Sequence, residues 1–220
     1  MRTTIVFIDL ETSGLDPNVH EITAFAGIKE KRGGIETLDI KIQMETPETA
    51  DPKALEIQGY TEDGWKGALS LAVAIARIRE FLSDCNIIVA HNVPFDVGFL
   101  EALSKKAKQR AQEQFPGMDE QQIRKAGIRL SRRMDTLVLA LEHLFPCGLH
   151  RLGLKSVCDF LGITGWEHHR AMDDAKACRR VYYKLVRAGF LKRLWWRLKY
   201  QLQKRKTLHF IEFGRGRAKG

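Results

Sequence analysis

Four acidic residues stand where a folded chain normally places apolar side chains. Two of them, Asp9 and Glu11, close an apolar segment that runs Thr-Ile-Val-Phe-Ile-Asp-Leu from residue 4 to residue 10. This composition is typical of a buried strand that ends at a turn near Ser13-Gly14. Because side chains alternate across a strand, the two carboxylates are expected on the same face of a sheet.

The other two acids, Asp96 and Asp174, share the apolar face of predicted helices. The apolar residues at helical spacing are Phe99, Leu100 and Leu103 after Asp96, and Cys178, Val181 and Leu185 after Asp174. A carboxylate on a core-facing stripe is costly unless a cation receives it. For Asp96 a structural alternative is open, since an acid in the first turn of a helix favours the helix dipole.

Together these four carboxylates suit hard divalent cations such as Mg²⁺ or Mn²⁺, and no Cys/His cluster indicates zinc. Two such ions can activate water and stabilise the leaving oxygen of a phosphodiester, with a histidine accepting the proton of the water. His169 precedes Asp174 by five residues, as His168 precedes the outward-facing Asp173. The helical period therefore selects His169, and His168 is interpreted as a solvated neighbour.

The segments that must position these groups predict an α/β fold, with a mixed sheet and helices on both of its faces. Strands are predicted at residues 4–10, 20–29, 35–44, 86–90 and 128–134. Helices are predicted at 52–59, 68–82, 135–144, 153–161 and 171–187, with a further helix that begins near Asn92 and Val93. The polar stretch 105–125 is interpreted as a helix end and a connection, broken at Pro116-Gly117.

Composition limits the classes of protein. With 220 residues, 44% of them hydrophobic and 29% charged, the chain is expected to form one large domain or a domain with an appendage. No apolar run approaches the roughly 20 residues that a membrane-spanning helix needs, and no export signal is recognised. The four cysteines lie far apart, without a Cys-x-x-Cys pair. A disulfide framework and a zinc ribbon are therefore not indicated, and a cytoplasmic location is predicted.

The excess positive charge is concentrated in the last thirty residues. Residues 191–220 carry ten Lys or Arg and one acid, which equals the net charge of +9 of the whole chain. Leucines at helical spacing after Phe190 predict a basic amphipathic helix. Three roles are open for it: binding nucleic acid, lying on an anionic membrane surface, or docking on the body of the protein. A solvated basic terminus is the simpler alternative.

Three ordered segments carry a family likeness. They run Phe-Ile-Asp-Leu-Glu-Thr-Ser-Gly-Leu-Asp over 7–16, His-Asn-Val-Pro-Phe-Asp-Val-Gly-Phe-Leu over 91–100, and His-Arg-Ala-Met-Asp-Asp-Ala over 169–175. They resemble the three exonuclease motifs of the DnaQ-like DEDDh 3′→5′ exonucleases, a branch that includes the proofreading epsilon subunit of bacterial DNA polymerase III. Residues 133–137 and 152–158 resemble its linking segments. Three motifs in order are far more specific than one.

The resemblance implies a ribonuclease-H-like fold over residues 1–188, with a five-stranded mixed sheet whose second strand is antiparallel to the rest. Residues 189–220 are expected to form a separate basic extension. By this likeness Asp9, Glu11 and Asp174 hold the catalytic metal ion, Asp9 bridges to a second ion that Asp96 reaches through water, and His169 is the general base. Implied substrate contacts come from the first two motifs, namely Thr12, Ser13, Gly14, Leu15, Asn92 and Phe95.

The resulting hypothesis is an exonuclease that uses two Mg²⁺ or Mn²⁺ ions to release 5′-mononucleotides from the 3′ end of a single strand. DNA is the favoured substrate, in proofreading beside a polymerase partner or in repair. An exoribonuclease is the nearest alternative. A catalytically inactive nucleic-acid-binding scaffold and a membrane-associated factor are the alternatives from other classes.

Overall fold

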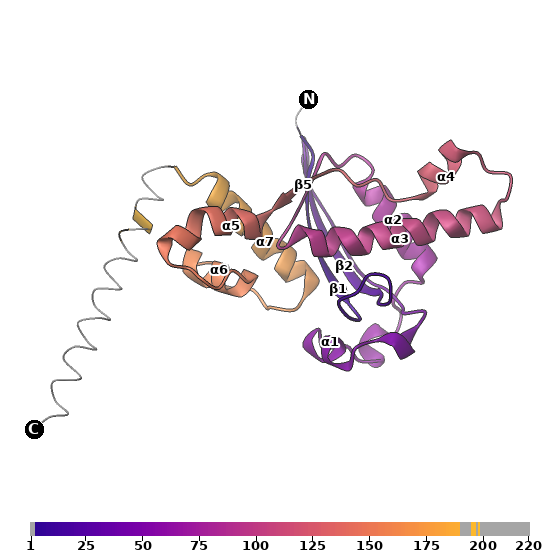
Figure 1. Ribbon diagram of the computed structural model, residues 1–220, viewed down its shortest axis with the longest axis horizontal. Helices are drawn as coiled ribbons and strands as arrows, with labels where there is room; N and C mark the ends of the chain where they lie inside the picture. The colour runs from indigo at the N-terminus through magenta and orange to yellow at the C-terminus, as the bar shows by residue number, and fades with distance from the viewer. Residues whose placement is uncertain (1–2, 190–194, 197, 199–220) are drawn as a thin grey trace, which may run out of the picture.

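The computed structural model describes residues 3–189 together with 195, 196 and 198. Its described part contains one five-stranded sheet in the order β3-β2-β1-β4-β5 (Figure 1). The strands are β1 (Ile5–Thr12), β2 (Ile22–Lys31), β3 (Gly34–Lys41), β4 (Ile87–Ala90) and β5 (Arg132–Asp135). Strand β2 is antiparallel to β1 and β3, whereas β4 is parallel to β1 and β5 is parallel to β4. The predicted mixed sheet with an antiparallel second strand is confirmed.

Helices cover both faces of the sheet (Figure 1). One face carries α2 (Leu71–Leu82) and α3 (Val93–Gln114), and the other carries α5 (Thr136–Leu144), α6 (Leu154–Leu161) and α7 (Ala171–Val186). Outside these layers lie α1 (Pro52–Ile57) and α4 (Glu120–Ala126). Short 3-10 turns occupy Pro47–Thr49, Asp63–Trp65 and Phe145–Cys147.

Strand β1 contributes side chains to the cores on both faces of the sheet, because successive side chains point to opposite faces. Val6, Ile8 and Leu10 are buried in the cluster on the α2 and α3 side. Phe7 lies on the opposite face, where its ring meets that of Tyr182 of α7 at 5.4 Å. Asp9 and Glu11 follow Phe7 at steps of two residues, so the sequence pattern directs both carboxylates toward α7.

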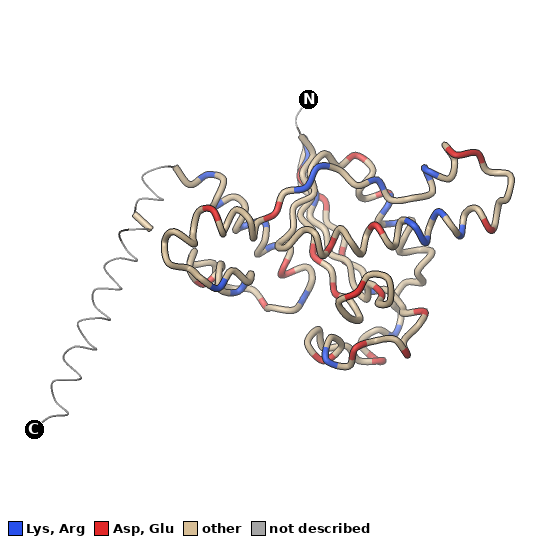
Figure 2. Tube along the Cα trace, in the orientation of Figure 1, with Lys and Arg blue, Asp and Glu red and all other residues tan. Residues whose placement is uncertain are grey.

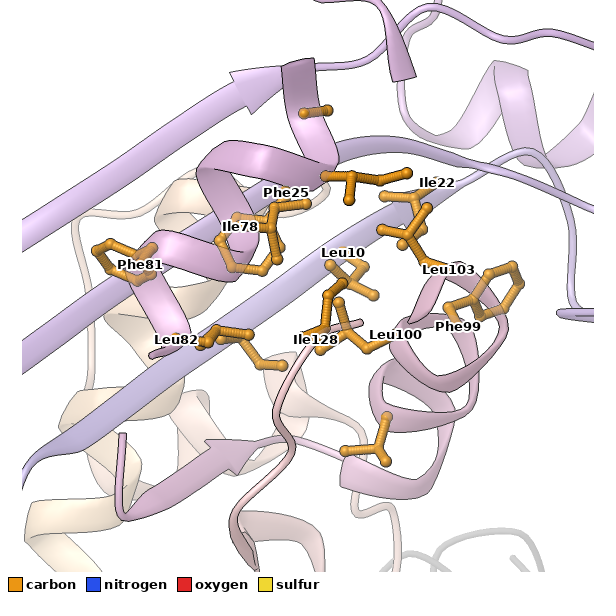
Figure 3. Packing of buried hydrophobic residues seen from close by; sticks show 14 of the residues in the cluster. Leu10, Ile22, Phe25, Ile78, Phe81, Leu82, Phe99, Leu100, Leu103 and Ile128 are labelled. Atoms are coloured by element: carbon orange, nitrogen blue, oxygen red, sulfur yellow. The ribbon is translucent and has the colours of Figure 1, made fainter. Parts of the chain in front are cut away.

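The larger hydrophobic core fixes helix α3 against the sheet. Figure 3 shows Leu100 and Leu103 of α3 packed near Leu10 of β1, with Phe25 and Ile78 on the far side of the cluster. Burial of each such side chain is worth about 1.5–3 kcal/mol. These contacts hold the amino-terminal turn of α3, which carries Asp96, close to the carboxyl end of β1.

A second cluster lies between α5, α6 and α7, and it includes one residue of the basic extension. Trp196 is only 5% exposed and packs among residues such as Leu144, Val157 and Val181. Trp195 beside it is 56% exposed. The remainder of the predicted amphipathic helix lies outside the described residues. Trp196 thus contacts the body of the protein, and the three roles of the extension stay predictions.

Helix α3 is longer than the sequence predicts, and the interpretation of 105–125 as helix end and connection is wrong over most of its length. The helix runs on to Gln114, and α4 follows after a short turn. Its polar second half consists of strong helix formers such as Lys, Gln, Glu and Ala, while Ala107 still contacts the core. The helix ends before Pro116, as the restriction on a residue preceding proline requires. Asp119 and Gln122 then form a capping box that starts α4.

Basic and acidic residues are interspersed along the described trace (Figure 2). This agrees with the balance of 26 basic and 26 acidic residues before residue 191. Within the described residues, none of the helices is both long and apolar enough to span a membrane.

Candidate active site

Asp9 and Glu11 lie near the carboxyl end of β1, on the face that α7 covers. Their partners across the antiparallel pair with β2 are small, Ala26 opposite Asp9 and Ala24 opposite Glu11. The register shifts between Glu11 and Thr12, which ends the regular pairing directly after the two acids. Small neighbours and a strand irregularity leave room for ligands beside the carboxylates.

Asp174 comes to the same place from the first turn of α7 and is 5% exposed. Carboxylate oxygens of Asp9, Glu11 and Asp174 lie within 4.8 Å of one another. The structure therefore brings together three of the four acids selected from the sequence. Asp173, which the helical period directs outward, forms an ion pair with Lys176 at 2.9 Å instead.

Asp96 approaches from the other helical layer, at the start of α3, and is 4% exposed. The backbone of Leu10 and that of Asp96 itself lower the pKa of this carboxyl group, but burial raises it by more. Asp96 lies outside the close group of three oxygen ligands, but its charge raises the pKa of Asp9. Its position matches a carboxylate that reaches a bound ion at longer range.

The four carboxyl groups all have raised pKa values, and burial is the largest cause for each. Burial, with the charges of Asp96, Asp174 and Glu11, raises the pKa of Asp9 well above its usual value. The pKa of Glu11 rises to about 7, through burial and then repulsion from Asp174. That of Asp96 rises to about 8, and burial also raises that of Asp174. Such shifts indicate a group of acids that lacks a compensating positive charge.

This donor set fits divalent metal ions. In the part of the chain that the structure describes, no lysine or arginine forms an ion pair with Asp9, Glu11, Asp96 or Asp174. Carboxylate oxygens are the ligands that Mg²⁺ and Mn²⁺ prefer. A bound cation would remove both the repulsion and the cost of burying the charges.

Both histidines of the doublet contact Asp174, in different ways. The backbone N–H of His169 donates to Asp174 Oδ2 at 3.0 Å, and His169 adopts a left-handed backbone conformation with φ of 66°. The ring of His168 lies with Nδ1 3.0 Å from Asp174 Oδ1, and its side chain is 35% exposed. The interpretation of His168 as a mere solvated neighbour is therefore incomplete. The sequence signal that favoured His169, its spacing from Asp174, carried no information about the neighbouring ring.

The predicted substrate residues of the first motif surround the end of β1. Thr12 is buried and donates from Oγ1 to the carbonyl oxygen of Gly14 at 2.7 Å. Ser13 accepts a hydrogen bond from the backbone N–H of Glu21. A Cβ atom at Gly14 would collide with the ring of His20, so a larger residue here would force that ring to move. Leu15 is 79% exposed, which is unusual for leucine and leaves it free to contact a ligand.

Asn92 and Phe95 lie at the start of α3. Asn92 is exposed and has a left-handed backbone with φ of 74°, which asparagine tolerates better than most residues. Phe95 is partly buried, with its ring 5.0 Å from that of Phe99. Asn92 is thus open to a ligand, whereas Phe95 also belongs to the core.

An open cleft of about 450 Å³ adjoins Glu11 and His169. Its wall continues over Gln58, Trp65 and Lys41. This volume falls in the range of small-molecule sites.

Two positioning residues escaped the sequence analysis. Asp135 accepts hydrogen bonds from the backbone N–H groups of Asn92 and Val93 at 2.9 and 3.1 Å, and from that of Leu137 at 2.8 Å. It therefore holds the start of α3 while it caps α5. Gln58 donates from Nε2 to the carbonyl oxygen of Thr12 at 3.1 Å. Neither residue has a periodic signal, because each acts across the tertiary fold.

Comparison with known proteins identifies the family. A sequence model of the RNase_T family, whose description is Exonuclease, matches residues 6–182. The chain belongs to this exonuclease family. The predicted likeness to DnaQ-like DEDDh exonucleases is thereby confirmed, and the description of the family agrees with the predicted enzyme class, a hydrolase of phosphodiester bonds. Exonucleases of this type use divalent metal ions.

Among curated proteins, this exonuclease-family chain is similar to PolC-type DNA polymerase III. It is 32% identical to the enzyme of Thermotoga maritima over 183 residues, which cover 83% of this chain and 12% of that protein. It is 30% identical to the enzyme of Listeria monocytogenes over 186 residues, which cover 84% of this chain and 11% of that protein. The chain thus spans about an eighth of the length of these relatives.

Solved structures of exonuclease I share its fold. A product-bound exonuclease I has a TM-score of 0.63 and 22% identity, over 84% of this chain and 43% of that one. The Escherichia coli enzyme in complex with a dT13 oligonucleotide has a TM-score of 0.62 and 20% identity, over 88% of this chain and 43% of that one. At this level of identity the likeness establishes the ribonuclease-H-like fold alone.

Proposed function

We propose that this chain is a metal-dependent 3′→5′ exonuclease that releases 5′-mononucleotides from single-stranded DNA. The observation that carries the proposal is the convergence of oxygens from Asp9, Glu11 and Asp174 within 4.8 Å, with buried Asp96 close by. Family membership supports phosphodiester hydrolysis, and the raised pKa values of the four acids support a cation at this place.

In this proposal Asp9, Glu11 and Asp174 would hold one divalent ion, and Asp9 together with Asp96 would hold a second. Such ions, Mg²⁺ or Mn²⁺, lower the pKa of a bound water and stabilise charge on the leaving oxygen. The chain itself contributes rigid placement of the acids, because β1, α3 and α7 are each packed into the core. It also contributes a partly buried environment that strengthens the electrostatic interactions.

His169 is the proposed general base. Partial burial and the adjacent His168 lower the pKa of His169, so that its imidazole is neutral and able to accept a proton near pH 7. Its exposed side chain faces solvent beside the cleft and next to the acids. The backbone hydrogen bond from His169 to Asp174 ties the proposed base to the proposed metal ligands.

The proposed substrate is a single strand with a free 3′ end. Support comes from the cleft beside Glu11 and His169, whose volume of about 450 Å³ suits a nucleotide, and from the exposed Leu15 at the motif turn. The relatives named DNA polymerase III, and the exonuclease I solved with dT13, favour DNA over RNA. A polymerase partner stays a prediction, and so does a role in repair.

The proposal is tested with a 5′-labelled single-stranded DNA and an RNA of the same sequence. Purified protein is incubated with each in Mg²⁺, in Mn²⁺ or in EDTA, beside the Asp9→Asn variant. We expect a ladder that shortens from the 3′ end of the DNA, and loss of that ladder in EDTA and in Asp9→Asn. Asp159→Asn, an exposed acid of α6 paired with Lys155 at 2.8 Å, is the matched control and should cleave like the wild type.

The same assay discriminates the alternatives. Faster shortening of the RNA would assign an exoribonuclease. Internal cuts or shortening from the 5′ end would contradict the proposed polarity. Binding of both strands without cleavage under either metal would favour a nucleic-acid-binding scaffold.

A further inference from the structure

The histidine doublet forms a second cluster of possible metal ligands next to the acids. Ligand atoms of His168, His169 and Asp174 lie within 4.8 Å of one another. The two imidazole rings stack with their centroids 3.9 Å apart and an interplanar angle of 27°. Only Asp174 is common to this cluster and to the group formed with Asp9 and Glu11.

The local backbone builds this arrangement. The left-handed conformation of His169 turns the chain sharply before α7, and its N–H donates to Asp174 Oδ2. His168 Nδ1 forms a hydrogen bond with the other carboxylate oxygen of Asp174, Oδ1, at 3.0 Å. The ring of Trp166 meets that of His168 edge-on at 5.0 Å and so limits its rotation. The short segment 168–174 therefore holds two imidazole groups and one carboxylate group close together.

The chemistry of this cluster differs from that of the acidic group. Imidazole nitrogen suits Zn²⁺ and similar transition ions, whereas Mg²⁺ prefers oxygen ligands. Two histidines and one carboxylate are also a known ligand set of zinc sites that keep an open fourth position. In a tetrahedral zinc site neighbouring ligand atoms are about 3.3 Å apart. His168 Nδ1 and Asp174 Oδ1 are 3.0 Å apart in a hydrogen bond, and the two rings are stacked, so an ion would replace the shared proton and turn the rings until their nitrogen lone pairs meet.

We propose that His168, His169 and Asp174 form a binding site for Zn²⁺ or a similar transition ion. The ion would take the carboxylate of Asp174 away from the Mg²⁺ site and engage the imidazole of His169. Bound zinc would thus block the proposed general base and one of the proposed metal ligands together. The inhibitory consequence rests on the proposed exonuclease function, whereas binding of the ion does not.

Binding is tested with Co²⁺, whose visible absorption reports a tetrahedral nitrogen and oxygen site. We expect the wild-type protein and Asp9→Asn to bind one Co²⁺ with such bands, and Zn²⁺ to displace it. His168→Gln should weaken Co²⁺ binding at least tenfold. His168 is partly exposed, so this variant should fold, and circular dichroism with a melting curve checks that it does.

Two outcomes would overturn the site. One is equal Co²⁺ affinity in the wild type and in His168→Gln, and the other is loss of Co²⁺ binding in Asp9→Asn, which would place the ion among the acids. His150→Gln is the control for a histidine outside the cluster and should leave the titration unchanged.

A second arm measures DNA cleavage in fixed Mg²⁺ as Zn²⁺ is added. We expect the zinc concentration for half inhibition to rise at least tenfold in His168→Gln relative to the wild type. Identical inhibition of the two proteins would contradict competition at Asp174. Absence of any Mg²⁺-dependent cleavage would count against the proposed function, while the Co²⁺ titration would still decide the zinc site.

Discussion

At the scale of single residues, the site is defined by charges that the fold concentrates instead of separating. Asp9, Glu11, Asp96 and Asp174 repel one another and are largely buried, which destabilises their ionised forms. A natural core avoids this arrangement unless a ligand compensates for it. The cost of burying the acids is thus evidence for what they bind.

Asp174 and Asp173 offer a direct test of this interpretation, because adjacent acids differ in direction. We expect Asp174→Asn to lower the rate of DNA cleavage more than about 100-fold, since loss of a metal ligand should exceed the 10–100-fold typical of residues that only support ligands. Asp173→Asn removes an ion pair with Lys176 and should change the rate less than about threefold, as exposed pairs contribute little. Equal effects of the two substitutions on single-turnover cleavage would contradict the assignment of Asp174.

The raised pKa values also predict how stability depends on pH. A carboxyl whose pKa is higher in the folded than in the unfolded chain stabilises the fold at low pH, and this contribution is lost as the pH rises through the folded value. With pKa values of about 7 for Glu11 and about 8 for Asp96, the Tm of the metal-free protein should fall between about pH 5 and pH 8.5. A loss of 1 kcal/mol corresponds to roughly 2–4 °C for a chain of this size.

Mg²⁺ should oppose that fall, because it binds the ionised carboxylates and stabilises the folded state by mass action. Differential scanning fluorimetry across this pH range, in EDTA and in Mg²⁺, measures both effects. In EDTA, the Tm of Glu11→Gln should fall less with rising pH than the Tm of the wild type. A Tm profile of Glu11→Gln parallel to that of the wild type would contradict the raised pKa of Glu11.

At the scale of elements, the sequence was informative wherever one element acts alone. The period of two in β1 placed Asp9 and Glu11 on one face, and the helical period separated Asp174 from Asp173. The second half of α3 was missed because its polar composition hid a strong helix propensity. Asp135 and the ring contact of His168 were not predictable, since both depend on residues brought together only by the tertiary fold.

Asp135, at the end of β5, connects the sheet by hydrogen bonds to the start of α3, the helix that carries Asp96. We expect Asp135→Ala to lower DNA cleavage at least tenfold and to weaken Mg²⁺ activation, because the start of α3 loses two hydrogen bonds. It should also lower stability by about 1–2 kcal/mol through the lost cap of α5.

Asp119→Ala is the matched control for this experiment. Asp119 caps α4, far along the chain from the acids, so its loss should also cost about 1 kcal/mol. Cleavage by that variant should stay at the wild-type level once the folded fraction is equal. If Asp135→Ala lost stability but its DNA cleavage depended on Mg²⁺ as in the wild type, Asp135 would act only as the cap of α5.

At the scale of the whole molecule, a neutral body is joined to a strongly basic extension. The acidic site lies near the carboxyl end of β1, whereas Trp196 packs in the cluster of α5, α6 and α7. Removal of the extension would therefore also remove a buried tryptophan, and the domain boundary between residues 188 and 189 stays a prediction. The packing of Trp196 and the positive charge of the extension need to be altered separately to learn what each contributes.

Two variants make that separation. Trp196→Ala should lower stability by about 3–5 kcal/mol, the usual cost of emptying a buried tryptophan site, and should shift the Tm without changing the salt dependence of DNA binding.

A triple change of Lys204, Arg205 and Lys206 to Gln should leave the Tm within about 2 °C. If those charges contact phosphates, it should reduce the slope of log K against log salt by about 2, because each neutralised phosphate contributes about 0.7 on a single strand. An unchanged slope, together with tail-dependent flotation on vesicles of anionic lipid, would assign the charge to a membrane surface instead.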